Sequence, residues 1–330
     1  MRFFYIFLFI LSGIFSLCFE AEGAQGYFWV VDQHPQANAI VKLSAGTRER
    51  LFEIEGFNVP TFLDVDERDG TFWVSDTGNN RVVRYSSDGE ELCVIEGFGY
   101  PYHLVICQDH DALWVADSLN GKVVKFSLDG KNKLLSVEEF KEPHDIIISP
   151  YDGSIWVSDQ AGRGVVRLSH KGKILSRIRR DFLMPKHLAV NPNDGSCWIT
   201  NGDNHFVVRI AVDGKKVLVK VGGFGTTYMA TVNPRDNSCW VSDLEKGEII
   251  KISDNGGIIK KVGGFDRCRG LTPVDPKDGT FWLGNWGAGE IIKLNSEGEI
   301  LSRMGGFKWP RLVVLSGSAS GRDRVSGGGQ

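Results

Sequence analysis

A short pattern centred on tryptophan recurs seven times along the chain. Each copy has a small or acidic residue, an apolar pair that ends in Trp, a further apolar residue and a closing Asp or Asn, as in GTFWVSD from Gly70 and GSIWVSD from Gly153. The tryptophans are Trp29, Trp73, Trp114, Trp156, Trp198, Trp240 and Trp282. Successive tryptophans are 44, 41, 42, 42, 42 and 42 residues apart. A period of about 40–50 residues over most of a chain is typical of the blades of a β-propeller.

Each repeat contains signals for four short strands. After the tryptophan strand come a turn and a strand with two apolar residues and a basic one, as at 82–84. An Asp-Gly turn leads to a third strand, and a proline often opens a fourth, as at 60–65. Strands of about five residues between Gly, Asn and Asp turns are typical of all-β folds, and no stretch has sustained helical periodicity. We therefore expect an all-β, seven-bladed β-propeller of four-stranded antiparallel blades.

The two ends of the repeat region complement each other. The first repeat begins at its tryptophan strand and lacks a preceding proline strand, whereas residues 310–315 form a proline strand with no tryptophan strand after it. We expect this C-terminal strand to join the N-terminal blade and close the ring, because closure removes exposed sheet edges. The propeller then covers residues 24–316, and residues 317–330, rich in Gly, Ser and Arg, form a disordered tail.

The N-terminus has the pattern of a targeting segment. Arg2 precedes an apolar run over residues 3–19, and small residues at Ala21 and Gly23 suit cleavage after Gly23. We therefore expect residues 1–23 to be a signal peptide and the protein to be extracytoplasmic, either periplasmic or secreted, with no membrane span after cleavage. The alternative is that the uncleaved segment anchors the protein, since its length is at the lower limit for a membrane span.

The net charge of the chain limits which class of partner it can bind. The chain has 38 Lys and Arg against 41 Asp and Glu, a formal net charge of −3. A nucleic-acid-binding surface needs a basic footprint that this composition does not provide, so we expect no nucleic-acid partner. We expect a monomer.

The motifs inside the repeat resemble those of the NHL-repeat β-propellers. The shared pattern is P-x-x-L-x-V, then WVSD-x-x-N-x-VVR, then DG, then GF, and it extends over about residues 26–316. The resemblance implies a propeller fold. It leaves the activity open, because such propellers include lyases, sensor domains and binding scaffolds, and some of the lyases use histidine and a divalent cation near the central channel.

Residues that recur in every repeat are explained by the fold. The tryptophans are expected to pack between blades, and the Asp/Asn that closes each copy is expected to bind backbone N–H groups at a turn. A basic residue also recurs on the strand that follows each tryptophan strand. We expect this basic column to form a solvated strand face with carboxylate partners in its own blade. This column is Lys42, Arg84, Lys125, Arg167, Arg209, Lys251 and Lys293.

Function is expected where the repeats differ, which is at the start of the proline strand. If this strand is innermost, its second residue after the proline position lines one mouth of the channel, and three consecutive repeats place His103, Asp145 and His187 there. Two imidazoles and a carboxylate can hold a divalent metal, Zn or Ca, or act in acid–base catalysis. The alternative is that these residues only line a wet channel entrance.

The preceding position of the same strand mixes aromatic and basic residues. Such a rim suits an anionic ligand or a peptide carboxylate. Its members are Tyr102, His144, Lys186, Tyr228, Arg269 and Arg311. We therefore expect an exported binding scaffold that takes a peptide, a protein or a small anionic ligand at the channel mouth. The alternative function is a metal-dependent lyase or hydrolase with a His/Asp site at the channel.

Overall fold

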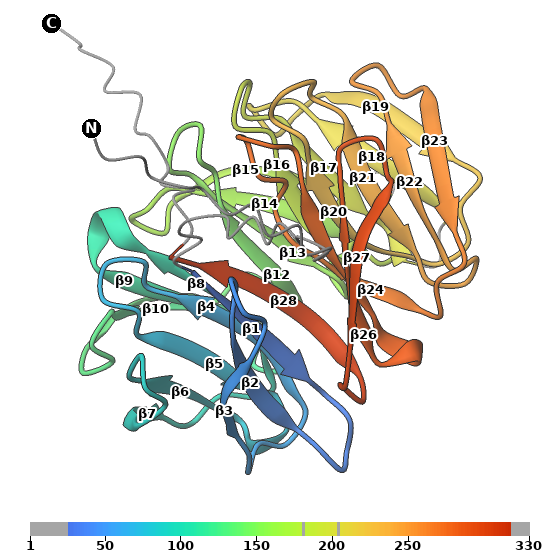
Figure 1. Cartoon of the computed structure of the whole chain (residues 1–330). Coiled ribbons are helices and arrows are strands. Elements are labelled where there is room, and N and C mark those ends of the chain that lie inside the picture. Colours follow the sequence, from blue (N-terminus) through green and yellow to red (C-terminus); the bar gives the residue numbers. More distant parts are fainter. Residues whose placement is uncertain (1–25, 180–181, 203–204, 318–330) are drawn as a thin grey trace, which may run out of the picture.

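The computed structural model describes residues 26–179, 182–202 and 205–317. Within them the chain forms seven antiparallel sheets of four strands each, which follow one another around a ring (Figure 1). The predicted seven-bladed, all-β propeller is confirmed. The predicted signal peptide and the predicted tail beyond Gly317 lie outside the described residues. In the part of the chain that the structure describes, no helix combines the length and the hydrophobicity needed to cross a membrane.

The proline strands are the innermost strands of the blades. Those of neighbouring blades contact one another in an unbroken ring, which places them around the central channel. In ring order they are β28 (Pro310–Ser316), β4 (Pro60–Val65), β8 (Pro101–Cys107), β12 (Pro143–Ile148), β16 (Leu188–Val190), β20 (Thr227–Val232) and β24 (Cys268–Leu271).

The other three strands of each blade follow outward in the order in which they occur along the chain. The tryptophan strands are second: β1 (Tyr27–Asp32), β5 (Phe72–Asp76), β9 (Ala112–Asp117), β13 (Ile155–Asp159), β17 (Cys197–Thr200), β21 (Cys239–Asp243) and β25 (Phe281–Asn285). The third strands are β2 (Ala39–Ser44), β6 (Arg81–Tyr85), β10 (Lys122–Ser127), β14 (Gly164–Leu168), β18 (Phe206–Ile210), β22 (Glu248–Ile252) and β26 (Glu290–Leu294). The outer strands are β3 (Arg50–Ile54), β7 (Glu91–Ile95), β11 (Lys133–Val137), β15 (Ile174–Ile178), β19 (Val217–Gly222), β23 (Ile258–Gly263) and β27 (Ile300–Gly305). Short 3-10 turns include η1 (Thr77–Asn79), η2 (Gln108–His110) and η4 (Trp286–Ala288).

The ring closes as the sequence predicts. The C-terminal strand β28 pairs with the N-terminal strand β1, so that one blade has the order β28-β1-β2-β3. The Trp29 indole N–H donates to the hydroxyl of Ser316 across this pair at 2.9 Å. Figure 1 shows β28, in red, beside the blue strand β1. The two ends of the domain therefore stabilise each other through a shared sheet.

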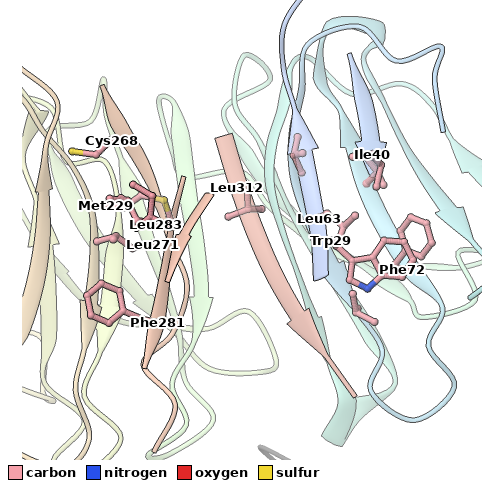
Figure 2. Close-up of a cluster of buried hydrophobic side chains, with 14 of the residues drawn as sticks. Trp29, Ile40, Leu63, Phe72, Met229, Cys268, Leu271, Phe281, Leu283 and Leu312 are labelled. Atoms are coloured by element: carbon pink, nitrogen blue, oxygen red, sulfur yellow. The ribbon is translucent and has the colours of Figure 1, made fainter. Parts of the chain in front are cut away.

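The tryptophan column packs between blades. Six of the seven tryptophans are at most 1% exposed, and Trp282 is 4% exposed. A Cβ built on Gly130, in the Asp-Gly turn of the next blade, would lie 2.8 Å from the Trp73 ring. Across the preceding interface of the ring, Figure 2 shows Trp29 against Phe72, with ring centroids 4.2 Å apart. The turn needs glycine here because any side chain would meet the tryptophan of the preceding blade.

Several members of the basic column are buried between blades, which corrects the expectation of a solvated face. Arg84 and Arg167 do have the expected carboxylate partners in their own blades, Asp69 and Asp152. Lys42, Lys125 and Lys251 are only 4–7% exposed. Their ammonium groups donate to backbone carbonyls in the turn of the next blade, 45 residues further along the chain: Lys42 to Ser87 at 2.6 Å, and Lys251 to Ser296 at 2.9 Å. Each basic residue is the cross-strand partner of a tryptophan, so its chain runs along a buried surface and its charge reaches the neighbouring blade.

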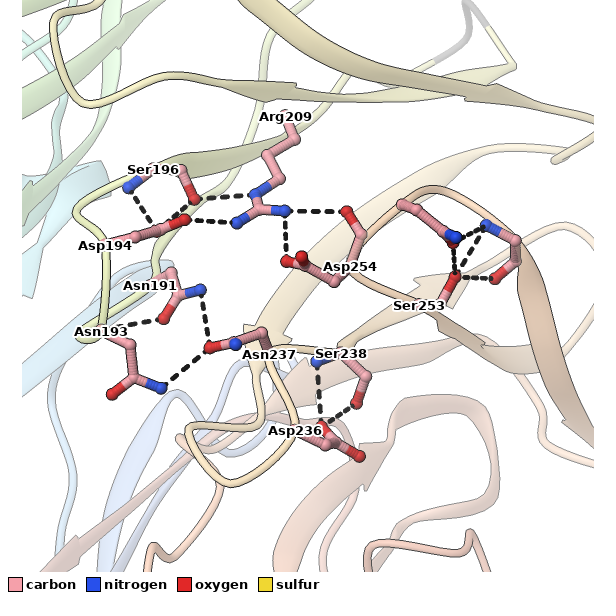
Figure 3. A network of polar contacts seen from close by, with 12 residues as sticks. Asn191, Asn193, Asp194, Ser196, Arg209, Asp236, Asn237, Ser238, Ser253 and Asp254 are labelled. Atoms are coloured by element: carbon pink, nitrogen blue, oxygen red, sulfur yellow. Dashed lines mark hydrogen bonds and ion pairs between the residues drawn. The ribbon is translucent and has the colours of Figure 1, made fainter.

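Arg209 shows the fullest version of this contact (Figure 3). Its guanidinium donates to Asp194 at 2.6 Å and to Ser196 at 2.8 Å within the blade, and to the carbonyl of Asp254 in the next blade at 2.8 Å. It also lies 5.8 Å from the Trp198 ring. The expected carboxylate partner in the same blade is present, and the contact also fastens two blades together.

The Asp/Asn column fastens the loops that lead into the innermost strands. Asp76 accepts a hydrogen bond from the backbone N–H of Asn58 at 2.8 Å, and Asp117 accepts one from Gly99 at 2.6 Å. Asp243 accepts one from Gly225 at 2.7 Å. The predicted role at a turn is confirmed. These bonds hold the loop two residues before each of these innermost strands begins, where the channel opens.

We expect Arg209→Met to lower the free energy of unfolding by about 1.5–3 kcal/mol, because it removes charge-assisted hydrogen bonds from a buried position between two blades. Arg303→Met is the matched control, since Arg303 is 44% exposed and pairs with Glu290 on the surface. Surface ion pairs contribute about 0–1 kcal/mol. Urea titrations followed by tryptophan fluorescence measure both variants, and equal losses would contradict the inter-blade role of Arg209.

Candidate ligand site at the channel mouth

A β-bulge lies near the start of most innermost strands. The register of pairing shifts between Pro101 and Leu104, between Pro143 and Ile146, and between Thr227 and Ala230. A bulge re-aims side chains, so that two consecutive residues can face the same side of a sheet. Both candidate positions of the innermost strands therefore reach the channel.

The two positions form two tiers around one small cavity. The outer tier, nearer the entering loops, is Thr61, Tyr102, His144, Lys186, Tyr228 and Arg311. The inner tier is Phe62, His103, Asp145, His187, Met229 and Leu312. The cavity between them has a volume of about 20 Å³, which is room for about one water molecule. A larger ligand must therefore lie against the outer tier or displace it.

Three residues of the outer tier close the channel. The hydroxyl groups of Tyr102 and Tyr228 are 3.0 Å apart, although the two residues are 126 positions apart in the chain. Arg311 donates to the Tyr102 hydroxyl, to the carbonyl of Thr61 at 3.1 Å and to the side chain of Gln33 at 3.0 Å. Arg311, a predicted ligand-binding residue, is only 7% exposed and holds this closure together.

Arg269 lies beside the closed tier, against two aromatic rings. Its guanidinium is 5.0 Å from the Tyr228 ring and 4.6 Å from the Trp286 ring. Its Nε is buried and has no hydrogen-bond partner among the described residues. Burial lowers the pKa of Arg269 from its ordinary value, and the nearby charge of Arg311 lowers it further. A buried guanidinium Nε without a hydrogen-bond partner is costly, and an anion could supply that partner.

Lys186 approaches Tyr228 from the other side. Its ammonium group is 5.5 Å from the centre of the Tyr228 ring. Within the described ranges, no carboxylate forms an ion pair with Lys186 or with Arg269. Together with Arg311, these residues place three positive charges around one phenol. Among the described residues, positive charge is therefore concentrated around Tyr228, although the whole chain has a net charge of −3.

The inner tier brings the three candidate metal ligands together. His103 Nε2 is 3.1 Å from Asp145 Oδ1, and His187 Nε2 is 3.9 Å from Asp145 Oδ2. Asp145 Oδ2 also accepts a hydrogen bond from the backbone N–H of Leu188 at 2.7 Å. His187 Nδ1 accepts one from the N–H of Ala230 at 3.3 Å, so the proton of neutral His187 is on Nε2, facing Asp145.

Burial keeps this cluster close to neutral. It raises the pKa of Asp145 to about 7, although the backbone N–H groups of Leu188 and Ile146 act in the opposite direction. Burial lowers the pKa of His187 to about 4 and that of His103 well below its ordinary value. At neutral pH the histidines are therefore uncharged, and Asp145 is poised between its two protonation states.

The predicted divalent metal stays a prediction. Among the described residues, no group of three or more His, Cys, Asp or Glu side chains has an arrangement suited to a metal ion. Both Asp145 oxygens already face a hydrogen-bond donor, and His187 Nδ1 is occupied by Ala230.

Comparison with known sequences identifies the family. A family model described as the virginiamycin B lyase family matches residues 99–304, more than half of the chain. The chain belongs to the virginiamycin B lyase family. A model of the NHL repeat matches residues 57–85, so the predicted resemblance to NHL-repeat propellers is confirmed. No curated protein matches the sequence.

Solved structures of the same fold include family members. Virginiamycin B lyase from Staphylococcus aureus is 19% identical, with a TM-score of 0.63 over 75% of this chain and 84% of that one. A streptogramin B lyase is 16% identical, with a TM-score of 0.67 over 79% and 87%. A functionally unknown protein from Desulfotomaculum acetoxidans is 14% identical, with a TM-score of 0.73 over 88% and 98%. At these identities the likeness shows the fold.

Three residues of the site were not predicted from the sequence. Gln33 and Thr61 receive hydrogen bonds from Arg311, and Trp286 packs against Arg269. Thr61 occupies the same repeat position as the predicted rim residues, so alignment of the repeats contains its signal. Gln33 and Trp286 follow the closing Asp32 and Asn285 of their repeats, and their role depends on how neighbouring blades meet.

We expect Asp145→Asn to gain stability relative to the wild type as pH rises from about 4 to about 7. The ordinary pKa of Asp145 is 3.8 and its folded pKa is about 7, so over this range the folded wild type binds a proton that the unfolded chain has lost. Its stability from this group therefore falls as pH rises, whereas asparagine does not titrate. The gain is at most about 4 kcal/mol, at 1.36 kcal/mol per pKa unit.

Urea titrations of both proteins at several pH values measure this difference. The lowered histidine pKa values make both proteins more stable as pH rises towards 6.5, and this effect cancels to first order in the comparison. Glu90→Gln, which changes an exposed carboxylate, is the control and should follow the wild type. Parallel stability curves for Asp145→Asn and the wild type would show that Asp145 titrates normally.

Proposed function

We propose that this protein is an exported propeller that binds a small anionic ligand, a carboxylate, at the mouth of its central channel. The observation that carries the proposal is Arg269, whose buried Nε has no hydrogen-bond partner among the described residues. A partly buried guanidinium is costly to leave unsatisfied. A carboxylate can accept two parallel hydrogen bonds from it and supplies the missing negative charge.

The surroundings of Arg269 define how the ligand is held. The rings of Tyr228 and Trp286 lie within about 5 Å of the guanidinium, which limits the directions in which it can point. Lys186 supplies a second positive charge across Tyr228. Because the cavity below is only about 20 Å³, the ligand rests on the outer tier. A free carboxylic acid and the C-terminus of a peptide share this chemistry.

Malonate tests the proposal as a minimal carboxylate probe, with binding measured by calorimetry at low ionic strength. We expect Arg269→Gln and Lys186→Gln each to weaken binding about tenfold or more, since hydrogen bonds to charged groups contribute about 1.5–3 kcal/mol. Lys260→Gln, on the exposed outer strand β23, is the control and should bind as the wild type does. Equal affinity in all four proteins, or no binding by the wild type, would overturn the proposal.

A second candidate function is a lyase, and the inner tier favours it. The hydrogen-bonded arrangement of His103, Asp145 and His187 can accept a proton near neutral pH, which elimination chemistry requires. Relatives in the family carry the names virginiamycin B lyase and streptogramin B lyase. A catalytically inactive variant of the Staphylococcus aureus enzyme has been solved with quinupristin.

Incubation with quinupristin separates the two candidates. If the protein is a lyase of this kind, chromatography shows loss of quinupristin with the wild type, and Asp145→Asn slows that loss at least tenfold. If it is a binding propeller for another ligand, quinupristin persists with both proteins while malonate binding is retained. A loss of quinupristin that does not depend on Asp145 would remove the inner tier from the mechanism.

A further inference from the structure

The hydrogen bonds of the outer tier have a direction. A guanidinium group only donates, so the Tyr102 hydroxyl accepts the bond from Arg311. The proton of Tyr102 is then free for donation, and the Tyr228 hydroxyl lies 3.0 Å away. Within the described part of the chain, the Tyr228 hydroxyl makes this one hydrogen bond. Tyr228 therefore receives a hydrogen bond in the way that an oxyanion does.

Positive charges face Tyr228 from three other elements. Arg269 of β24 is 5.0 Å from the ring, Lys186 of the segment before β16 is 5.5 Å away, and Arg311 of β28 is 5.8 Å away. Burial by itself would raise the pKa of Tyr228. The charges of Arg311 and Arg269, the hydrogen bond from Tyr102 and the charge of Lys186 together hold that pKa below its ordinary value.

Of the other titratable groups described nearby, Tyr102 and the histidines add no charge at pH 7, whereas Asp145 adds a negative charge as the pH rises past its pKa of about 7. Burial raises the pKa of Tyr102 well above its ordinary value, so Tyr102 keeps its proton. Burial lowers the pKa of His144, which stacks on Tyr102, and that of His187, so both rings are neutral at pH 7. The carboxyl group that lines the cavity, Asp145, has its pKa raised to about 7 by burial. Tyr228 is thus the phenol best placed to ionise.

We propose that Tyr228 is the proton acceptor of the channel mouth and takes a proton from the carbon next to the carboxylate of the bound ligand. This inference rests on the proposed carboxylate site, because Arg269 and Lys186 would hold the ligand beside the Tyr228 oxygen. The C–H bond breaks, and the proton forms an O–H bond on Tyr228. The electron pair left on carbon moves into the carboxyl group, whose added negative charge Arg269 and Lys186 stabilise. Return of a proton from Tyr228 completes an exchange without oxidant or cofactor.

Ultraviolet titration of tyrosinate tests the ionisation without any ligand. We expect one tyrosine of the wild type to ionise at lower pH than the others. Tyr228→Phe should lose that transition, and Tyr102→Phe should shift it to higher pH because the hydrogen bond to the oxyanion is gone. Tyr151→Phe is the control, since Tyr151 is 52% exposed and does not line the cavity, and it should retain the transition. A wild type with no early transition, or one that Tyr228→Phe retains, overturns the proposal.

Exchange of the malonate methylene protons in D₂O, followed by nuclear magnetic resonance, tests the proton transfer. We expect the wild type to accelerate this exchange. The acceleration by Tyr228→Phe should be at least tenfold smaller, although this variant still binds malonate in calorimetry. Binding without accelerated exchange overturns the role of Tyr228 and leaves the proposed function standing. If malonate does not bind, the proposed carboxylate site fails, and the titration still decides whether Tyr228 ionises early.

Discussion

The packing between each tryptophan and the turn of the next blade is the interaction on which the rest of the structure depends. Trp73 lies against Gly130, and lysines paired with tryptophans, such as Lys42 and Lys251, reach turns of the neighbouring blades. An isolated four-stranded blade cannot bury its tryptophan, so each blade is stabilised by its neighbour. The pairing of β28 with β1 gives the first and last blades the same support and closes the ring.

Closure of the ring also creates the chemistry at the channel mouth. The aspartate column holds each entering loop, and the bulges turn two residues per innermost strand towards the axis. Side chains from distant repeats then meet, as Tyr102 and Tyr228 do. The charged groups lie in two tiers with different character: an electropositive outer tier with phenols, and an inner tier in which burial keeps Asp145 and its histidines near neutrality.

Alignment of the repeats predicted which strand is innermost and which of its residues reach the channel, because identical positions in a repeat occupy identical places in a ring. It could not predict the closure by Arg311, which contacts Gln33, just after β1, and Thr61 on β4. It was also wrong about the lysines of the basic column that reach the next blade, Lys42, Lys125 and Lys251. A lysine that alternates with apolar residues is typical of a solvated strand face, and only the neighbouring blade turns that face into a buried interface.

The amino-acid sequence by itself determined the number of blades, their strand order and the closing strand, since these follow from periodicity and turn residues that act over short distances. The tertiary structure alone decided which side chains touch across the channel and which charges lack a partner. It also decided how burial shifts the pKa of Asp145 and how neighbouring charges shift that of Tyr228. These properties depend on distances between residues from different blades. Such distances are set by the curvature of the closed ring, which no single repeat encodes.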